Sequence, residues 1–271
     1  MTSALLDLKI PTRREARLAI LRRHTAELPF FDRYDAGDRE AAWAGLQELG
    51  PQVREDPYAA DALAVAYETM ARARANLETI AQRLGAMGYR FFSCARPVRE
   101  PVLRAPARSA FSQILALEKE AGALPLSARA WFAISGNVEL TGVHPRLSFI
   151  RDRSPERSQL EWDLVFTDPL VIYGVEDASK CFEYAGHVGF SGCASTKADA
   201  DDGGDPYMLI LEAAGADCLI HGCLGVSERI TFVQYLRRAC EWGGFPGFSE
   251  PKWAEYRPPE LDNLREGLLP I

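Results

Sequence analysis

The sequence lacks a long apolar run and a recognisable export signal. No segment of the 271-residue chain approaches the run of about 18 apolar residues that a membrane-spanning helix needs. Near the start of the chain, a short apolar stretch is followed by charged residues. A signal peptide has the opposite order. We therefore expect a cytoplasmic protein with no membrane partner.

The motifs that identify common enzymes and cofactor-binding proteins are also absent. There is no G-x-G-x-x-G fingerprint, no phosphate-binding G-K-[ST] loop and no H-E-x-x-H motif. The stretch around Ser191 resembles a nucleophile elbow, but Cys193 stands where the motif requires its last glycine. We expect a non-enzymatic protein without a cofactor. An enzyme of an unrecognised type is the first alternative.

Cysteine pairs with metal-binding spacing are missing as well. The six cysteines are scattered and none forms a C-x-x-C pair, so we interpret them as small core side chains in a reducing compartment. Cys218, His221 and Cys223 are close together in the sequence. Alternate strand residues face opposite ways, so only His221 and Cys223 share a face, whereas structural zinc needs four ligands. We expect no metal.

Acidic residues outnumber basic residues in this sequence. The chain has 31 Lys and Arg against 38 Asp and Glu, a net charge of −7, which gives no overall attraction to nucleic acid. A local basic cluster occupies the expected first helix and comprises Arg13, Arg14, Arg17, Arg22 and Arg23. No aromatic residues interleave with it, so we expect a solvated helix face. A nucleic-acid-associated factor is the second alternative.

The residues that are present predict helices at the start of the chain. Thr12 and Glu15 fit a capping box, and the helix is expected to continue to Pro29. Asp38 is expected to cap a second helix, which ends at Gly50.

A third helix has the clearest periodicity in the sequence. Asp56 is expected as its N-cap, and apolar residues from Leu63 to Met87 recur at spacings of three, four and seven. Arg74 interrupts this stripe. A stripe this wide must be buried. We therefore expect the helical region 1–95 to pack against the rest of the chain.

The remainder is predicted to be a Pro/Arg-rich extended connector, 96–108, and a unit at 109–271. The unit should open with two short helices and close with a helix at 231–240, and its core should include Trp131 and Phe232. The strand-like runs between these helices are Val138–Leu140, Leu147–Ile150, Trp162–Phe166, Leu170–Tyr173, Cys181–Tyr184, Tyr207–Leu211 and Cys218–Ile220. The fold class is therefore α+β, with a helical N-terminal region followed by a mixed or antiparallel sheet flanked by helices.

An acidic segment interrupts the strand-rich part. It contains Asp199, Asp201, Asp202 and Asp205 together with two glycines. No glutamate closes it at the position that a calcium-binding loop requires. A solvated turn is one interpretation, and a docking surface for a basic partner is the other.

The order of motifs around residues 117–137 resembles the SUKH superfamily. A helix and Gly122 are followed by Leu124-Pro125, a second helix containing Trp131, and the turn Gly136-Asn137. The resemblance covers about residues 109–250. It implies an α+β protein-binding domain, such as a toxin-neutralising immunity protein or a signalling scaffold, and it implies no catalytic residues.

Overall fold

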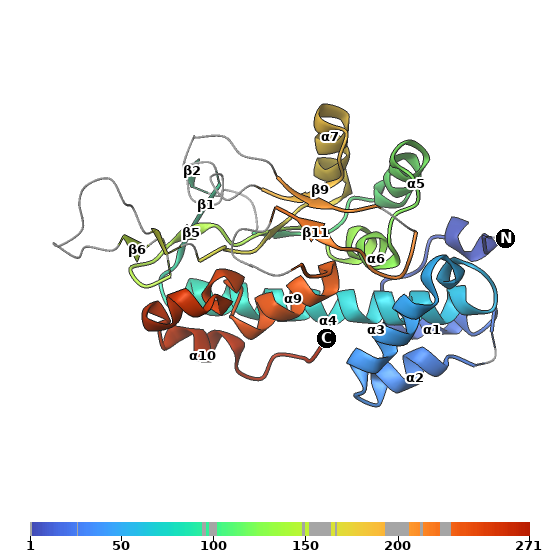
Figure 1. Ribbon diagram of the computed structural model, residues 1–271, viewed down its shortest axis with the longest axis horizontal. Coiled ribbons are helices and arrows are strands. Elements are labelled where there is room, and N and C mark those ends of the chain that lie inside the picture. Colours follow the sequence, from blue (N-terminus) through green and yellow to red (C-terminus); the bar gives the residue numbers. More distant parts are fainter. Residues whose placement is uncertain are drawn as a thin grey trace.

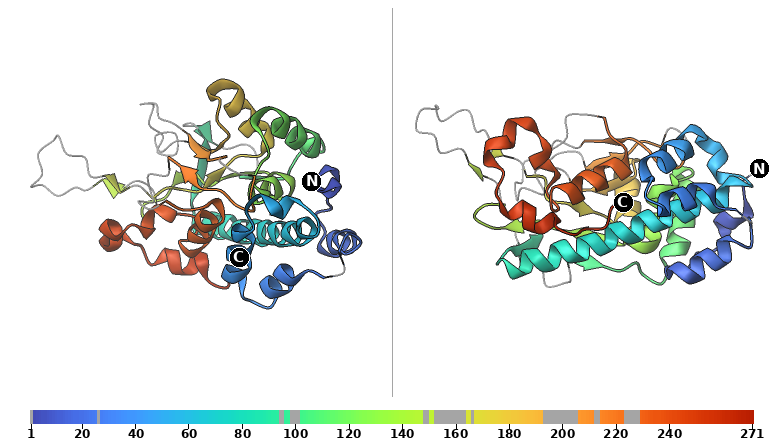
Figure 2. Two further views of the ribbon diagram at one scale, coloured as in Figure 1. Left: turned by 45° about the vertical axis from the view of Figure 1, so that its right-hand side comes forward. Right: turned by 90° about the horizontal axis from the view of Figure 1, so that it is seen from below.

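The strands of this α+β fold lie between two layers of helices (Figures 1 and 2). Helices α4 and α9 lie on one side of the strands, and α5 and α7 lie on the other. The computed structural model describes residues 2–25, 27–93, 96–97, 102–147, 150–151, 164–165, 167–192, 206–211, 214–222 and 229–271. In this part of the chain, no helix combines the length and the apolar character needed to cross a bilayer.

The helices are distributed over the whole described chain. The α-helices are α1 (Arg14–Leu21), α2 (Pro29–Asp35), α3 (Arg39–Glu48), α4 (Tyr58–Ala86), α5 (Ala110–Ala121), α6 (Leu126–Ile134), α7 (Val175–Ala185), α9 (Phe232–Glu241) and α10 (Glu260–Arg265). The 3-10 helices are η1 (Ala4–Asp7), η2 (Gly50–Arg54), η3 (Pro246–Ser249) and η4 (Pro251–Tyr256).

The described strands are short, and their pairs are antiparallel, as expected. They are β1 (Arg90–Ser93), β2 (Arg96–Pro97), β3 (Leu103–Arg104), β4 (Asn137–Glu139), β5 (Gly142–Val143), β6 (Ile150–Arg151), β7 (Leu164–Val165), β8 (Val171–Ile172), β9 (Gly189–Ser191), β10 (Tyr207–Leu209) and β11 (Ile220–His221). The sheet orders are β3-β4-β8, β11-β10-β9 and β2-β1-β5, and β6 pairs with β7. The Tyr173 N–H donates to the Phe190 carbonyl at 2.7 Å, which connects the first two sheets.

Helix α4 is the central element of the fold. It has 29 residues, and every residue from Ala59 to Met70 is buried, because α1, α2, η2 and α6 pack around it. Alanines at alternate positions in this stretch let those neighbours approach closely. Arg74, which interrupts the apolar stripe, donates from Nη1 to the Ser135 carbonyl at the end of α6. The expected packing of the helical region against the rest is confirmed, whereas the division into 1–95, 96–108 and 109–271 stays a prediction.

The predicted core residues Trp131 and Phe232 are confirmed. Their side chains are 0% and 1% exposed, and their rings meet edge to face with centroids 6.0 Å apart. Phe190 extends this cluster to Tyr235, and the Trp131 indole N–H donates to the Tyr173 carbonyl at 3.1 Å. One apolar cluster thus continues from the sheet side into α4.

The start and the end of the first helix differ from the prediction. Helix α1 begins after Arg13, which makes no side-chain cap, so the capping box expected at Thr12 and Glu15 does not form. Pro29 does not end the first helix. It starts α2 instead, where a proline at the first position loses no intrahelical hydrogen bond. Helix α4 also starts one residue later than expected, with Pro57 as its N-cap.

The segment Cys181–Tyr184 was predicted as a strand and is part of α7. Its two aromatic residues are common in strands, but Val175, Ala178 and Phe182 recur at helical spacing and face the core. Gly174 precedes the helix, and the acidic residues of the first turn favour the N-terminal end. The longer helical pattern therefore prevails over the strand-like composition of these four residues.

Candidate functional site

A groove runs between α3, α9 and the segment that follows α10. It consists of two adjoining cavities of about 520 and 480 Å³, and Glu40, Arg237 and Glu241 line both of them. Residues 268–271 form one wall of the first cavity, and Trp43 of α3 lines the second. We call this feature the α3–α9 groove.

Helix α9 is fixed at its first turn, which determines where its polar face points. Thr231 and Gln234 form a capping box, with hydrogen bonds of 2.9 and 3.3 Å between each side chain and the other residue's backbone N–H. Asp217 accepts a further hydrogen bond from the Val233 N–H at 3.2 Å. Because the apolar face of α9 is buried in the core, Arg237 and Glu241 lie on the groove side.

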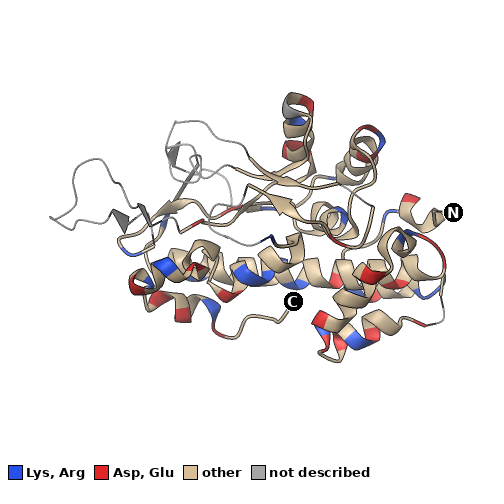
Figure 3. Cartoon of the chain, in the orientation of Figure 1, with Lys and Arg blue, Asp and Glu red and all other residues tan. Residues whose placement is uncertain are grey.

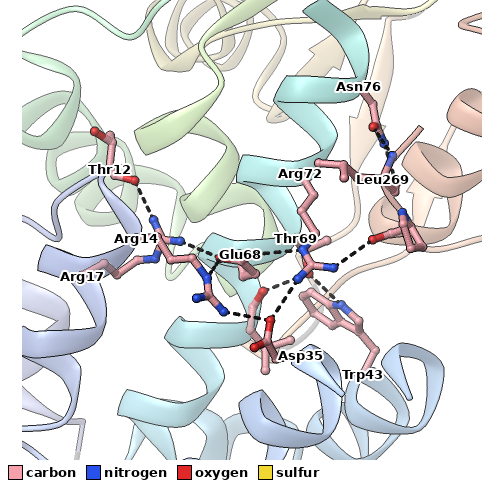
Figure 4. Close-up of polar contacts among 12 residues, drawn as sticks. Thr12, Arg14, Arg17, Asp35, Trp43, Glu68, Thr69, Arg72, Asn76 and Leu269 are labelled. Atoms are coloured by element: carbon pink, nitrogen blue, oxygen red, sulfur yellow. Dashed lines mark hydrogen bonds and ion pairs between the residues drawn. The ribbon is translucent and has the colours of Figure 1, made fainter. Parts of the chain in front are cut away.

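The wall after α10 is held by backbone contacts to α4 (Figure 4). Asn76 donates to the Leu269 carbonyl and accepts from the Leu269 N–H, both at 2.7 Å. Nη1 of Arg83 donates to carbonyls at residues 263, 264 and 266. Nε of Arg237 donates to the Ile271 carbonyl at 2.8 Å. The segment is therefore positioned largely through its main chain.

Two guanidinium groups in the groove retain unused hydrogen-bond donors. Among the described residues, no acceptor lies within hydrogen-bond distance of the buried Nη2 of Arg237 or of the buried Nε of Arg39. Burial lowers the pKa of Arg237, and the nearby Tyr34, Glu40 and other acidic groups oppose that effect. A buried donor without an acceptor is costly in the unbound protein. A small shift of either side chain toward the cavity would let a ligand oxygen accept from it, and such a contact is favourable.

The groove carries charges of both signs. Arginines at 39, 229, 237, 238 and 265 line it together with acidic residues at 38, 40, 217 and 241. Figure 3 shows basic and acidic segments interleaved on these helices. Burial raises the pKa of Cys240 to about 12, so this lining thiol is not a nucleophile at neutral pH. The described lining residues include no histidine. The chemistry present is that of polar recognition.

The arginines of the first helix are not uniformly solvated, which corrects the sequence-based expectation. Arg17 is 0% exposed, and its Nη2 donates to Glu68 at 3.0 Å while its Nη1 donates to the Thr12 carbonyl at 2.8 Å (Figure 4). Glu68 also binds Arg14 and Arg72, at 3.3 and 3.0 Å. Burial lowers the pKa of Arg17, and the charge of Glu68 opposes that effect. This cluster links α1 to α4.

A second buried charged group lies on the sheet side. Asp168 is 0% exposed, and its two carboxylate oxygens accept from the hydroxyls of Tyr207 and Tyr235 at 3.0 and 3.1 Å. Its φ of 49° lies in the left-handed region, which is uncommon for a residue with a side chain. These contacts join β10 and α9 to the segment before β8. They occupy both carboxylate oxygens in structural hydrogen bonds.

As far as the structure describes them, the residues of the enzyme and metal alternatives are not assembled into a site. Ser191 is buried in β9, and its hydroxyl donates to the neighbouring Gly192 carbonyl. Cys218 is buried, and burial raises its pKa well above the usual value, whereas His221 is exposed. Cys223 lies outside the described residues. Within the described ranges, no three His, Cys, Asp or Glu side chains gather as a metal-binding group.

The acidic docking surface proposed from the sequence stays a prediction. Asp199, Asp201, Asp202 and Asp205 all lie outside the described residues. The α3–α9 groove, in turn, was missed by the sequence analysis. The one sequence feature that could have indicated the groove was the Arg237-Arg238 pair. It lies on the polar face of the helix at 231–240, whose apolar face was predicted correctly. That pair could not be connected with Glu40, nearly 200 residues earlier.

Comparison with known proteins places no constraint on the function of this fold. No family model, no curated protein and no solved structure matches the chain.

Proposed function

We propose that this chain is a non-enzymatic protein-binding domain whose α3–α9 groove holds an extended segment of a partner protein. The observation that carries the proposal is the pair of buried guanidinium nitrogens, on Arg39 and Arg237, that have no acceptor among the described residues. Both residues line the same 520 Å³ cavity. Carboxylate side chains and main-chain carbonyls of a protein segment supply the oxygens that such donors bind.

The charge distribution indicates how a partner would be selected. Arg237 lies close enough to Glu40 and Glu241 to feel their charges, and all three residues line both cavities of the groove. A partner with a carboxylate opposite Arg237 and cations opposite the two glutamates is favoured, and one with the reverse order is repelled. Arginine is also a frequent contributor of binding energy at protein interfaces.

The SUKH resemblance supports the same class of function. The order of α5, Leu124-Pro125, α6 and β4 agrees with the order that the resemblance implies. The partner would then be a toxin that the chain neutralises, or a component assembled on a signalling scaffold. The described cysteines, Cys181, Cys218 and Cys240, are all free, which supports a reducing, cytoplasmic location.

The nucleic-acid alternative receives less support. Arg14 and Arg17, which would have contacted phosphates, bind Asp35 and Glu68 instead. An arginine in such a pair is less available for a phosphate, because the pair must first be broken.

Site-specific photo-crosslinking in the native host tests the proposal. A photoreactive residue at Gln47, which is exposed and lines the groove, should crosslink a defined protein. The same residue at Glu183, exposed on α7 in the opposite helical layer, is the matched control. The purified crosslinked protein should then bind the chain directly, and Arg237→Gln should weaken that binding. Equal crosslinking from both positions, or none from Gln47, contradicts the proposal.

A further inference from the structure

A separate cavity of about 630 Å³ lies where the segment before α1, the segment before α5 and the end of α6 meet. Its size is in the range of small-molecule sites. Residues 9–13 form one side, residues 105–111 form another, and Ala133 and Ile134 come from α6. Tyr67 of α4 closes the inner end and is itself buried.

The charge of this cavity differs from that of the whole chain. Lys9, Arg13 and Arg108 line it, and the described lining residues include no aspartate or glutamate, although the chain as a whole carries a net charge of −7. None of the three cations makes an ion pair or hydrogen bond with the described part of the chain, whereas Arg14, next to Arg13, binds Asp35 and Glu68. Three cations around one cavity, with no partner among the described residues, produce a locally positive potential.

The start of two helices adds to this potential. Helix α1 begins after Arg13 and helix α5 begins at Ala110, and both residues line the cavity. Neither helix has a side-chain hydrogen bond at its N-cap. The first N–H groups of a helix and its dipole favour a negative charge nearby.

The inner lining is apolar. Ile10, Tyr67, Phe111 and Ile134 contribute aliphatic and aromatic surface beside the cations. An inorganic anion alone would leave this surface in contact with water. A ligand that also carries an apolar body would bury this surface, which favours binding.

We propose that this cavity binds a small amphiphilic anion, in which one phosphate or carboxylate group is attached to an aromatic or branched aliphatic body. The anionic group lies between Arg13 and Arg108, and the apolar body contacts Tyr67 and Phe111. This site is independent of the α3–α9 groove, with which it shares no lining residue.

Isothermal titration calorimetry of the full chain with phenyl phosphate tests the proposal. We expect saturable one-to-one binding that is about tenfold weaker in Arg13→Gln and in Arg108→Gln, since each substitution removes a charge-assisted contact. Both residues are exposed, so neither change should disturb folding, and circular dichroism checks this. Arg22→Gln, an exposed arginine at the other end of α1, should leave the affinity unchanged.

Two further probes separate the contributions of charge and apolar surface. Inorganic phosphate should bind more weakly than phenyl phosphate, and benzyl alcohol, which lacks the anion, should not bind. The proposal is overturned if phenyl phosphate shows no saturation up to about 10 mM, or if inorganic phosphate binds equally well. An equal loss of affinity in Arg22→Gln would show nonspecific charge attraction and would also overturn it.

Discussion

The helical base of the molecule is held by buried charges, and the sheet side is held by aromatic rings. In the base, Glu68 is 6% exposed and links arginines of α1 and α4. On the sheet side, Trp131, Phe190 and Phe232 meet edge to face with centroids 5.5–6.0 Å apart. Both regions share the apolar core around α4, but the contacts that specify their arrangement differ in kind.

The difference indicates how each region should respond to change. Removing one member of a buried ion pair leaves an uncompensated charge. The free energy of unfolding therefore falls by more than the pair itself contributes to stability. Removing an aromatic ring leaves a cavity, and the resulting decrease in the free energy of unfolding depends on how far the neighbouring residues move to fill it. The helical base should therefore be sensitive to the chemistry of single side chains, and the sheet side to their volume.

The largest effect is expected for Trp131→Ala on the sheet side. The side chain is fully buried and packs on Phe232, so we expect the free energy of unfolding to fall by about 3–5 kcal/mol. Urea denaturation followed by circular dichroism measures the change. Trp131→Phe, which keeps most of the volume but loses the hydrogen bond to Tyr173, should cost less. A variant with unchanged stability would place Trp131 outside the core.

A comparable or slightly smaller effect is expected for Glu68→Ala in the helical base. Arg17 would be left buried without its carboxylate, at a cost of about 3 kcal/mol or more. Glu68→Gln has nearly the same volume and should still destabilise the protein, because it removes the charge. Lys180→Ala, which removes one member of an exposed pair with Glu176, should have no measurable effect. If Glu68→Gln retains wild-type stability in urea denaturation, packing and not charge holds this region.

A smaller, pH-dependent effect is expected for Asp61, which accepts hydrogen bonds from the backbone N–H groups of Phe30 and Phe31 at 2.8 Å. Burial raises the pKa of Asp61 from 3.8 to about 6. The folded state therefore binds this proton more tightly than the unfolded state. The contribution of Asp61 to the free energy of unfolding is fully present below pH 4, where the carboxyl is protonated in both states. It decreases by up to about 3 kcal/mol as the pH rises through 6.

Asp61→Asn removes the titrating group. A comparison of this variant with the wild type therefore separates the effect of Asp61 from the effects of the other carboxylates. The stability of the wild type relative to Asp61→Asn should fall between pH 4 and pH 7, as measured by urea denaturation at several pH values. A difference that stays constant over this range would show that the carboxylate has an ordinary pKa in the folded protein.

The elements with long, consistent local patterns could be predicted from the sequence. The apolar spacing of α4 and the face of α9 that carries Phe232 both indicated helices. Trp131 was placed in the core because it lies near the end of the short helix that starts after Pro125. The segment Cys181–Tyr184 was misassigned because four residues with strand-like composition are too few to reveal a helical period. The correct period is visible only when Val175 and Ala178 are included.

The polar contacts could not be predicted, because they join residues far apart in the sequence. Arg17 is separated from Glu68 by 51 positions, and Asn76 from Leu269 by 193. The residues that neighbour Arg17 in the sequence do not distinguish it, a buried arginine, from the exposed Arg22 and Arg23. The α3–α9 groove depends on three such distant segments, so only the arrangement of the helices reveals it.

The affinity of the crosslinked partner for Arg237→Gln tests the proposed function most directly. Arg237→Gln should weaken binding about tenfold to a hundredfold, the range for a lost charge-assisted hydrogen bond. Arg237→Lys, which keeps the charge but loses the planar guanidinium, should give an intermediate value. Circular dichroism should show unchanged folding in both variants. An affinity equal to that of the wild type in a folded Arg237→Gln variant would contradict recognition in the α3–α9 groove.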